Sequence, residues 1–335
     1  MPTLHLIVPN KRPFGRGSMM MFNPGRWLRA LAAGLILVAG ALVAAPPAQA
    51  ATGRFFYGTY VSIYGTRDYH GYVPSTYRPG TPIPLVVALH GCTENDVGFD
   101  VLTGWSARAE QKGFAVVMPD QNNLVNPAGC WNWMLPTNQH RGLGEPAIIA
   151  GITNRVASQY GADRRRVYVT GVSAGGVMAN IMAVSYPDVY AAASIVAGCE
   201  YLCDILQNTT PQQSGRAALQ EMGSRARKVP VVVFQGTSDI VVPPSTAYRV
   251  AGQWTTVAGA DATPDGTVNG QVPSGRSYTL LRYHDNAGRA IVDQYMINGA
   301  GHKYPGGCPC SLYGDPAGPD ATGLTWDYFA AHPMP

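Results

Sequence analysis

The sequence is poor in charged residues. Only 13% of the 335 residues are Asp, Glu, Lys or Arg, and the formal net charge is +4 at pH 7, part of it carried by the N-terminal 50 residues. A charge balance this small creates no field that would attract nucleic acid or an anionic membrane surface. We therefore expect no nucleic-acid partner and an electrically neutral substrate or ligand.

The sequence also lacks an apolar run long enough to span a membrane. Residues 31–45 are apolar, but a run of about 15 residues is short of the roughly 20 that a span needs, which disfavours a retained anchor. Arg26 and Arg29 precede this run, and Ala48-Gln49-Ala50 supplies a small-residue cleavage pattern. We predict that residues 1–50 are an N-terminal extension and secretory signal peptide, and that the mature protein is extracellular and free of the membrane. The true start stays open among Met1, Met19, Met20 and Met21.

Zinc-site spacing is absent, although cysteines are present. An even number of cysteines in an exported protein favours disulfides over free thiols. The pairs 199/203 and 308/310 resemble metal or redox pairs only superficially, since no histidine spacing accompanies them. We expect no metal and no cofactor. Six cysteines allow 15 pairings, so their spacing leaves the connectivity open; they are Cys92, Cys130, Cys199, Cys203, Cys308 and Cys310.

Internal repeats are absent as well, and residues 51–335 are predicted to form a single α/β domain. Strand-like apolar runs alternate with helical patterns, which predicts a doubly wound, mostly parallel sheet with helices on both faces and an active site at the carboxyl ends of the strands. A helical face is expected at Val101, Leu102, Trp105 and Ala109. The expected strands are 54–62 and 69–73 as an antiparallel pair, 85–89, 114–118, 167–170, 192–197, 231–235, 278–283 and 291–297, and the expected helices are 146–160, 245–257 and 325–330, with another after residue 173.

A strand followed by Gly171-Val172-Ser173-Ala174-Gly175 and a helical pattern is the signature of a nucleophile elbow. The glycines are needed because side chains at these positions would collide with neighbouring backbone on so sharp a turn. Ser173 is therefore the candidate nucleophile; the alternative is a tight structural turn.

The serine needs a base that follows it in the chain. His284 lies in an expected hairpin turn, and His332 lies close to the end of the sequence, where order is not expected. His302, in Gly299-Ala300-Gly301-His302 directly after a strand, is the predicted general base.

The base needs an acid that orients it. Asp239 leaves the strand 231–235 at the edge of the sheet, where it can accept a hydrogen bond from the imidazole. Asp293 is the second candidate, but it lies in the middle of a strand and is expected to face solvent. Asp239 is the predicted acid.

An oxyanion hole requires two convergent backbone N–H groups. One is expected from Ala174, and the other from Cys92 or Thr93 in the loop after strand 85–89. His90 is expected to hold this loop by hydrogen bonding, and we also count it among the residues around the substrate.

Six short motifs lie along the chain: 89–93 (LHGCT), 130–133 (CWNW), 142–146 (GLGEP), 171–176 (GVSAGG), 299–302 (GAGH) and 315–321 (DPAGPDA). Together they resemble the polyhydroxybutyrate depolymerase family of esterases, which is similar in fold to feruloyl and acetylxylan esterases. The resemblance covers nearly all of the chain from about residue 68 onward. It implies an α/β-hydrolase without a metal, a Ser173–Asp239–His302 triad and a disulfide between Cys92 and Cys130.

Two departures from the family pattern are visible. No Ser/Thr-rich linker with a separate substrate-binding domain follows the catalytic region, which counts against attack on crystalline polymer. Lys303-Tyr304 replaces the small-aromatic pair expected after the histidine, which is expected to alter the rim of the cleft.

The long loop 119–145 is the candidate substrate region, because loops of this length in compact domains usually carry function. Trp131 and Trp133 would face the same side of an extended backbone. They either line a groove for the acyl group or polymer, or pack the loop; both readings stay open. Order is expected from apolar anchors at Leu124, Trp131, Trp133 and Leu135, whereas the arginines 164–166 are expected to be a solvated face.

Together these features predict a secreted, monomeric serine ester hydrolase. Its expected substrate is a short-chain polyhydroxyalkanoate polymer or oligomer, cleaved through an acyl-enzyme. The alternatives are a feruloyl or acetylxylan esterase acting on plant polysaccharide, and a non-catalytic wall- or polymer-binding protein on a hydrolase scaffold.

Overall fold

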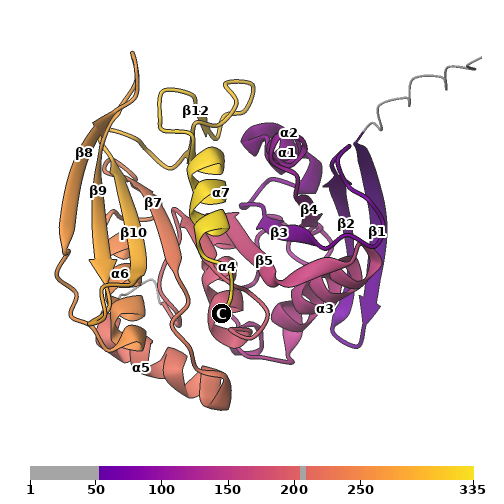
Figure 1. Ribbon diagram of the computed structural model, residues 1–335, viewed down its shortest axis with the longest axis horizontal. Coiled ribbons are helices and arrows are strands. Elements are labelled where there is room, and N and C mark those ends of the chain that lie inside the picture. The colour runs from indigo at the N-terminus through magenta and orange to yellow at the C-terminus, as the bar shows by residue number, and fades with distance from the viewer. Residues whose placement is uncertain (1–52, 204–208) are drawn as a thin grey trace, which may run out of the picture. The chain divides into compact units, whose positions relative to one another are not determined.

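The computed structural model describes residues 53–203 and 209–335 (Figure 1). The predicted signal peptide, its cleavage after Ala50 and the candidate start methionines lie outside the described residues. Within the described ranges, no helix is both long enough and apolar enough to cross a bilayer.

The described residues form a ten-stranded sheet with the order β1-β2-β4-β3-β5-β6-β7-β10-β9-β8. Its six central strands run parallel, and the two-strand margins on either side are antiparallel (Figure 1). Such a sheet confirms the predicted mostly parallel architecture. The strands are β1 (Arg54–Ser62), β2 (Gly65–Val73), β3 (Ile83–Leu89), β4 (Ala115–Pro119), β5 (Ala162–Val172), β6 (Ala193–Val196), β7 (Val231–Gly236), β8 (Gly266–Gln271), β9 (Ser277–His284) and β10 (Ala290–Ile297).

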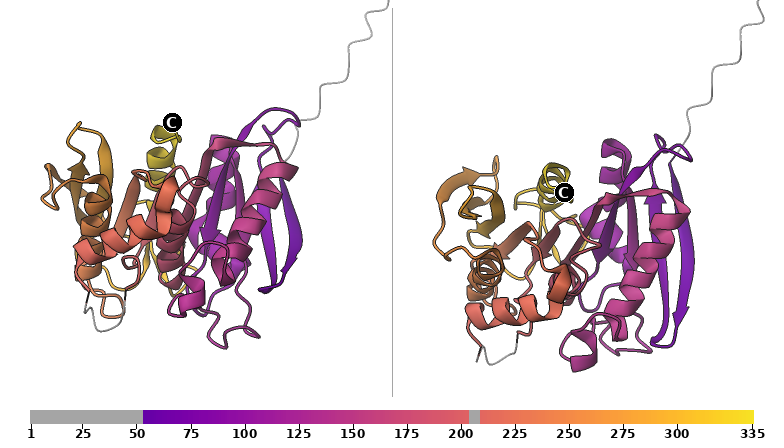
Figure 2. Two further views of the ribbon diagram at one scale, coloured as in Figure 1. Left: turned by 90° about the horizontal axis from the view of Figure 1, so that it is seen from below. Right: turned by 60° about the horizontal axis from the view of Figure 1, so that its bottom comes forward.

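The central strands are apolar at nearly every position because helices cover both faces of the sheet. One apolar cluster joins the sheet to α3 (Gly144–Gln159), α4 (Ala174–Ser185), α5 (Pro211–Met222) and α6 (Ser245–Ala258). The other joins it to α1 (Asp96–Thr103), α2 (Trp105–Lys112) and α7 (Ala321–Ala331). In Figure 2 the yellow α7 lies across the sheet from the orange and magenta helices.

Aromatic stacking fixes α7 on its face. Phe329 lies parallel to Tyr168 of β5, with ring centroids 4.7 Å apart, and Trp326 stacks on Phe114 at 3.9 Å. Stacked aromatic pairs contribute about 0.5–1.5 kcal/mol each beyond the area that they bury. The helix therefore closes the second core and leaves the carboxyl ends of the strands open for the site.

Four details of the elements differ from the sequence-based expectation. The expected helical face at 101–109 belongs to two helices, because Gly104 adopts a left-handed conformation (φ 69°) between α1 and α2, and Val101 is 58% exposed. Helix α5, which begins with a capping box at Thr210 and Gln213, was not expected, and neither was β8. Helix α3 begins at Gly144, ahead of Pro146.

Candidate active site

The turn between β5 and α4 holds Ser173 in a strained conformation. Its backbone lies at φ 55° and ψ −122°, where L-residues are rare. A Cβ on Gly171 would lie 2.2 Å from the carbonyl oxygen of Gly175, and a Cβ on Gly175 would lie 2.2 Å from that of Leu89. Only glycine fits at these two positions. The sharp turn places the serine hydroxyl at the carboxyl edge of the sheet.

The side chains of His302 and Ser173 are within hydrogen-bonding distance. Nε2 of His302 lies 3.0 Å from Oγ of Ser173, and Nδ1 lies 2.8 Å from Oδ2 of Asp239. The loops after β7 and β10 are themselves in contact, since the Ser238 N–H donates to the Ala300 carbonyl over 2.9 Å. The structure thus brings the three predicted residues into one hydrogen-bonded chain.

Asp239 is held by four hydrogen bonds. Oδ1 accepts from the backbone N–H groups of Val241 and Val242, each at 2.9 Å, and Oδ2 accepts from His302 and from Nε2 of Gln235 at 3.1 Å. Burial alone would raise the pKa of this carboxyl. The hydrogen bonds from His302 and the backbone outweigh that effect and hold the pKa below its usual value. Gln235 was not predicted; its signal was a polar residue near the end of an apolar strand.

The alternative acid and bases lie elsewhere. The side chain of Asp293 in β10 is only 18% exposed, so its expected solvent-facing position is wrong; it faces Arg282. Nδ1 of His284 lies 3.3 Å from Oδ2 of Asp265. His332 lies at the end of α7, where its Nδ1–H donates to the Tyr328 carbonyl over 2.7 Å.

Of the N–H groups of Gly91, Cys92 and Thr93 in the loop after β3, one is free within the described residues. The Thr93 N–H donates to the Ala128 carbonyl over 2.7 Å, and the Gly91 N–H donates to Oε2 of Glu94 over 3.1 Å. The Cys92 N–H has no acceptor within the part of the chain that the structure describes. Thr93 therefore cannot be the oxyanion donor, and of the two predicted residues only Cys92 can join Ala174, the first residue of α4.

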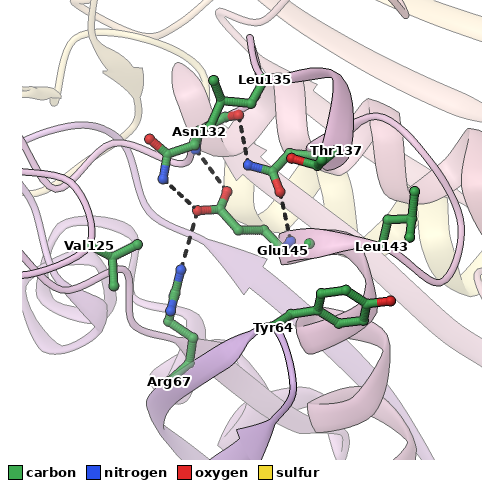
Figure 3. Close-up of a pocket in the computed structure, with 10 residues that line it drawn as sticks. Tyr64, Arg67, Val125, Asn132, Leu135, Thr137, Leu143 and Glu145 are labelled. Carbon is green, nitrogen blue, oxygen red and sulfur yellow. Dashed lines mark hydrogen bonds and ion pairs between the residues drawn. The ribbon is translucent and has the colours of Figure 1, made fainter.

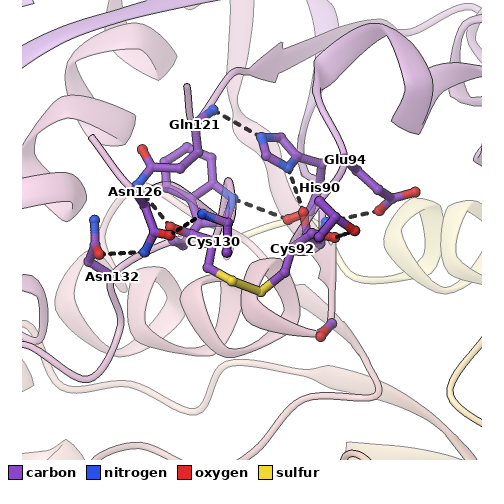
Figure 4. The surroundings of a disulfide bond; sticks show 12 residues. His90, Cys92, Glu94, Gln121, Asn126, Cys130 and Asn132 are labelled. Carbon is purple, nitrogen blue, oxygen red and sulfur yellow. Dashed lines mark hydrogen bonds between the residues drawn. A yellow bond between two sulfur atoms is a disulfide. The ribbon is translucent and has the colours of Figure 1, made fainter. Parts of the chain in front are cut away.

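His90 supports this loop from inside the protein. Its side chain is fully buried, its Nδ1–H donates to the Gly91 carbonyl over 2.8 Å, and its Nε2 accepts from the Gln121 N–H over 2.9 Å (Figure 4). Burial lowers the pKa of His90, so the neutral ring can make both bonds. The loop-holding role fits this geometry, whereas the predicted contact between His90 and substrate is wrong because the side chain does not reach the surface.

The structure pairs Cys92 with Cys130, joining residues 90–93, the predicted oxyanion loop, to the loop that carries Trp131 and Trp133 (Figure 4). Beside the disulfide, Nε1 of Trp131 donates to the His90 carbonyl over 3.1 Å. Two further disulfides lie in the described ranges and resolve the pairing that the spacing left open: Cys199 with Cys203, and Cys308 with Cys310.

The buried carboxylate of Glu145 holds the loop that carries Trp131 and Trp133. Glu145, at the start of α3, accepts from the Asn132 N–H (2.7 Å), from the Asn132 side chain (2.8 Å) and from Arg67 (3.3 Å) (Figure 3). It also accepts from Nε2 of Gln121 over 2.6 Å. Arg67 is 2% exposed and Glu145 is 3% exposed. Buried charges that are paired and fully hydrogen-bonded fix a loop strongly.

The long loop is held both by these polar groups and by two of its four expected apolar anchors, Trp131 and Trp133. Leu124 is 97% exposed and Leu135 is 52% exposed, so neither anchors the loop. Trp131 is buried and Trp133 packs against the same core. The glutamate lies inside the quoted motif 142–146, but the sequence gives no sign of its partners.

A cavity of about 630 Å³ opens above Ser173. Trp131 and Trp133 both line this cavity and both pack the loop against the core. The two alternatives that the sequence left open for them therefore hold together. Tyr304 is buried and its hydroxyl is 2.9 Å from that of Thr322, so it does not shape the rim as expected. The described residues that line the cavity are Cys92, Asn126, Ala128, residues 130–135, Ser173, Ala174, Val177, Cys199, Glu200, Cys203, residues 241–243 and Thr246.

Among the described residues, no three His, Cys, Asp or Glu side chains are grouped so that they could hold a metal ion. The reactive groups of the site are the serine, the imidazole, the carboxylate and the backbone N–H groups. Arranged in this way, they can perform acyl transfer through a nucleophilic serine.

Comparison with known proteins gives consistent results. The family model described as "Esterase PHB depolymerase" matches residues 68–268. Poly(3-hydroxyalkanoate) depolymerase C of Paucimonas lemoignei is 34% identical over 281 residues, which cover 79% of this chain and 66% of that protein. Feruloyl esterase B of Neurospora crassa is 31% identical over 252 residues, covering 70% of this chain and 82% of that protein.

Among solved structures, the acetyl xylan esterase from Aspergillus awamori superposes with a TM-score of 0.64 at 22% identity, covering 82% of this chain and 99% of that one. Together with the sheet order, this likeness confirms the predicted α/β-hydrolase fold.

Proposed function

The chain belongs to the esterase PHB depolymerase family, and from this premise we propose that it is a secreted serine hydrolase that cleaves short-chain polyhydroxyalkanoate polymers or oligomers. The observation that carries the proposal is the hydrogen-bonded chain from Asp239 through His302 to Ser173 beneath an apolar cavity.

The proposed reaction proceeds in two halves. Ser173 Oγ attacks the ester carbonyl while Nε2 of His302 takes its proton, and Asp239 stabilises the imidazolium through Nδ1–H. The N–H groups of Cys92 and Ala174 donate to the developing oxyanion, each contributing on the order of 10²–10³ in rate. His302 then protonates the leaving alcohol. A water molecule, deprotonated by the same imidazole, hydrolyses the acyl-enzyme and releases the free acid.

The character of the cavity supports a neutral, largely apolar substrate. Its lining is mainly apolar, and apolar side chains are exposed around it: Met134 (63%), Leu135 (52%), Val241 (63%) and, next to Val241, Ile240 (93%). Contiguous exposed apolar residues usually mark a binding surface. A polyester chain with short alkyl branches matches such a surface better than a sugar, which requires many hydrogen-bonding partners.

Disulfides support the proposed extracellular location. Three are present in the described ranges, and disulfides persist in oxidising compartments. We further propose that the chain acts as a monomer with residues 51–335 as one catalytic domain, and that the signal peptide is removed after Ala50.

The test is hydrolysis of amorphous polyhydroxybutyrate and of methyl ferulate by the wild-type protein and by Ser173→Ala. We expect release of hydroxybutyrate by the wild type and none above background by the variant. Hydrolysis of ferulate alone would replace the proposed polyester substrate with a feruloyl ester, the substrate named in the Neurospora crassa relative's description. Full turnover by Ser173→Ala would refute the nucleophile, and an inert wild type would favour a polymer-binding protein.

A further inference from the structure

Gln235 carries the only polar side chain of strand β7 (Val231–Gly236), whose residues are all buried. The glutamine itself is 1% exposed. A buried amide destabilises the fold unless its polar atoms are hydrogen-bonded, so a glutamine at the end of a run of valine and phenylalanine has to be explained by its partners.

The NH₂ group of Gln235 is directed at two oxygen atoms. Its Nε2 lies 3.1 Å from Oδ2 of Asp239 and 3.0 Å from the carbonyl oxygen of Val242. A backbone carbonyl and an ionised carboxylate can only accept hydrogen bonds. The reversed amide would turn its own oxygen toward both of them, so these partners fix the NH₂ group of Gln235 in its place.

These bonds close a ring around the carboxylate. The Val242 N–H donates to Oδ1 of Asp239 over 2.9 Å, while the Val242 carbonyl accepts from the same amide that donates to Oδ2. Oδ2 is also the oxygen that lies 2.8 Å from Nδ1 of His302. Gln235 therefore shares an acceptor with the imidazole, although it is not among the described residues that line the cavity.

We propose that Gln235 is a positioning residue for the reaction: it holds Asp239 in the orientation that accepts from His302, and it limits the negative charge that Oδ2 presents to the imidazole. This inference rests on the proposed ester hydrolysis, with Asp239 as the orienting acid. An oxygen that accepts from two N–H donors is less negative toward each of them. The same amide ties the acid to Val242, which lines the cavity.

Two carboxylates act on the imidazole of His302. Asp239 is bonded to it from the loop after β7. Glu94 lies in the loop after β3; burial raises the pKa of its carboxyl, and a hydrogen bond from Gly91 and the charge of His302 oppose that rise. The next residue, Lys303, is exposed. Glu94 and Lys303 are the same in every variant below, so differences between these variants report on Asp239.

Gln235→Met removes the donor and keeps the length of the side chain. We expect kcat for p-nitrophenyl butyrate to fall about tenfold, with KM within about twofold, because a hydrogen bond to a charged acceptor is lost. Without the amide, Oδ2 presents more negative charge to the imidazole and favours its protonated form. The acid limb of the pH profile of kcat/KM should therefore move up by about half a pH unit.

Gln294, on the neighbouring strand β10, offers a matched control. It is also fully buried, and its side chain is hydrogen-bonded to the Tyr283 hydroxyl and to the sulfur of Met296. Gln294→Met removes a buried amide from the same sheet and should lower stability as Gln235→Met does. It should leave kcat within about twofold of the wild type and the acid limb in its place.

Gln235→Glu keeps the shape of the side chain and makes the donor titratable. The protonated carboxyl can donate to Oδ2 of Asp239, whereas the ionised form cannot and adds a second negative charge beside the acid. The ratio of variant to wild-type kcat should therefore be highest at low pH and fall by about tenfold or more as the pH rises and the proton is lost. This variant tests the inference even if Gln235→Met fails to fold.

The inference would be overturned if Gln235→Met matched Gln294→Met in kcat and in its acid limb, because the amide would then have only a structural role. A ratio for Gln235→Glu that stays constant with pH would overturn it as well. Either result would leave the proposed ester hydrolysis intact. A wild type that hydrolyses no ester would instead overturn the proposed function, and this inference with it.

Discussion

Two walls of the catalytic cavity are held in different ways. The tryptophan wall, residues 130–135, is fastened from behind by the disulfide to Cys92 and by the buried carboxylate of Glu145. The valine wall, residues 241–243 with Thr246, is held by its own turn, in which backbone N–H groups donate to Asp239. At the tip of that turn Ile240 is 93% exposed.

Each wall of the cavity is connected to a group with a predicted role in the reaction. The tryptophan wall shares its disulfide and a buried hydrogen bond with the predicted oxyanion loop, and the valine wall shares its turn with Asp239, the predicted acid. Changes in the supports of either wall should therefore alter turnover. Changes at the exposed tip should alter only contact with a large substrate.

The largest effect is expected where the valine wall meets the acid. Asp239→Asn retains an oxygen for the N–H groups of Val241 and Val242, but an amide NH₂ facing His302 favours the wrong tautomer of the imidazole. We expect kcat for p-nitrophenyl butyrate to fall by about 10³–10⁴, with little change in KM. A loss below tenfold would show that Asp239 is not the orienting acid.

Next comes the support of the tryptophan wall. Glu145→Gln removes the buried charge opposite Arg67 and turns an NH₂ group toward existing donors. We expect the free energy of unfolding to fall by about 3–5 kcal/mol, measured by urea denaturation, and kcat to fall because the oxyanion loop loosens. Asp188→Asn, which removes the partner of the half-exposed Arg141, is the control and should cost less than about 1 kcal/mol. Equal losses in the two variants would contradict this account.

A smaller effect, on stability, is expected from a change in pH and comes from His70 in β2. Burial opposes protonation of His70, but the carboxylates of Asp100 and Asp96 outweigh it and raise the pKa from 6.5 to about 9. The charged form is therefore favoured by folding. About 3 kcal/mol of stability is present below pH 6.5 and is lost as the pH rises through about 9. The free energy of unfolding, measured by urea denaturation across this pH range, should fall with rising pH in the wild type but not in His70→Gln. If the two proteins show the same dependence on pH, His70 does not contribute this stability.

The smallest effect is expected at the tip of the valine wall. Ile240→Ser should change stability by less than about 0.5 kcal/mol and leave small-ester kinetics unchanged, because the side chain is almost fully exposed. Binding to a polyester film, measured by depletion from solution, should weaken. If kcat/KM for p-nitrophenyl butyrate fell as much as binding to the film, Ile240 would act on the reaction itself and not on contact with a large substrate.

The reactive groups were predictable because each belongs to a short local pattern. Ser173 follows a strand and lies between close-packed glycines, and Asp239 and His302 each follow a strand whose neighbour in the sheet is parallel. The topology then brings the strand ends together. Their catalytic roles stay predictions, while their hydrogen-bonded arrangement is a property of the structure.

The supporting groups were not predictable, because their partners are distant in sequence. Arg67 and Glu145 are 78 residues apart, and the choice between Cys92 and Thr93 depends on a backbone bond to Ala128. Helix α5 was missed because it contains few large apolar residues: its buried face consists of Ser214, Gly215, Ala218 and Met222.

The central claim is that Ser173 is the nucleophile of an ester hydrolase. It is tested most directly by treatment with diisopropyl fluorophosphate, followed by mass spectrometry of the digested protein. The account predicts one phosphoryl group per chain, on the peptide that contains Ser173, with loss of esterase activity in proportion to labelling. Full activity after exhaustive treatment, or the label on another residue, would contradict it.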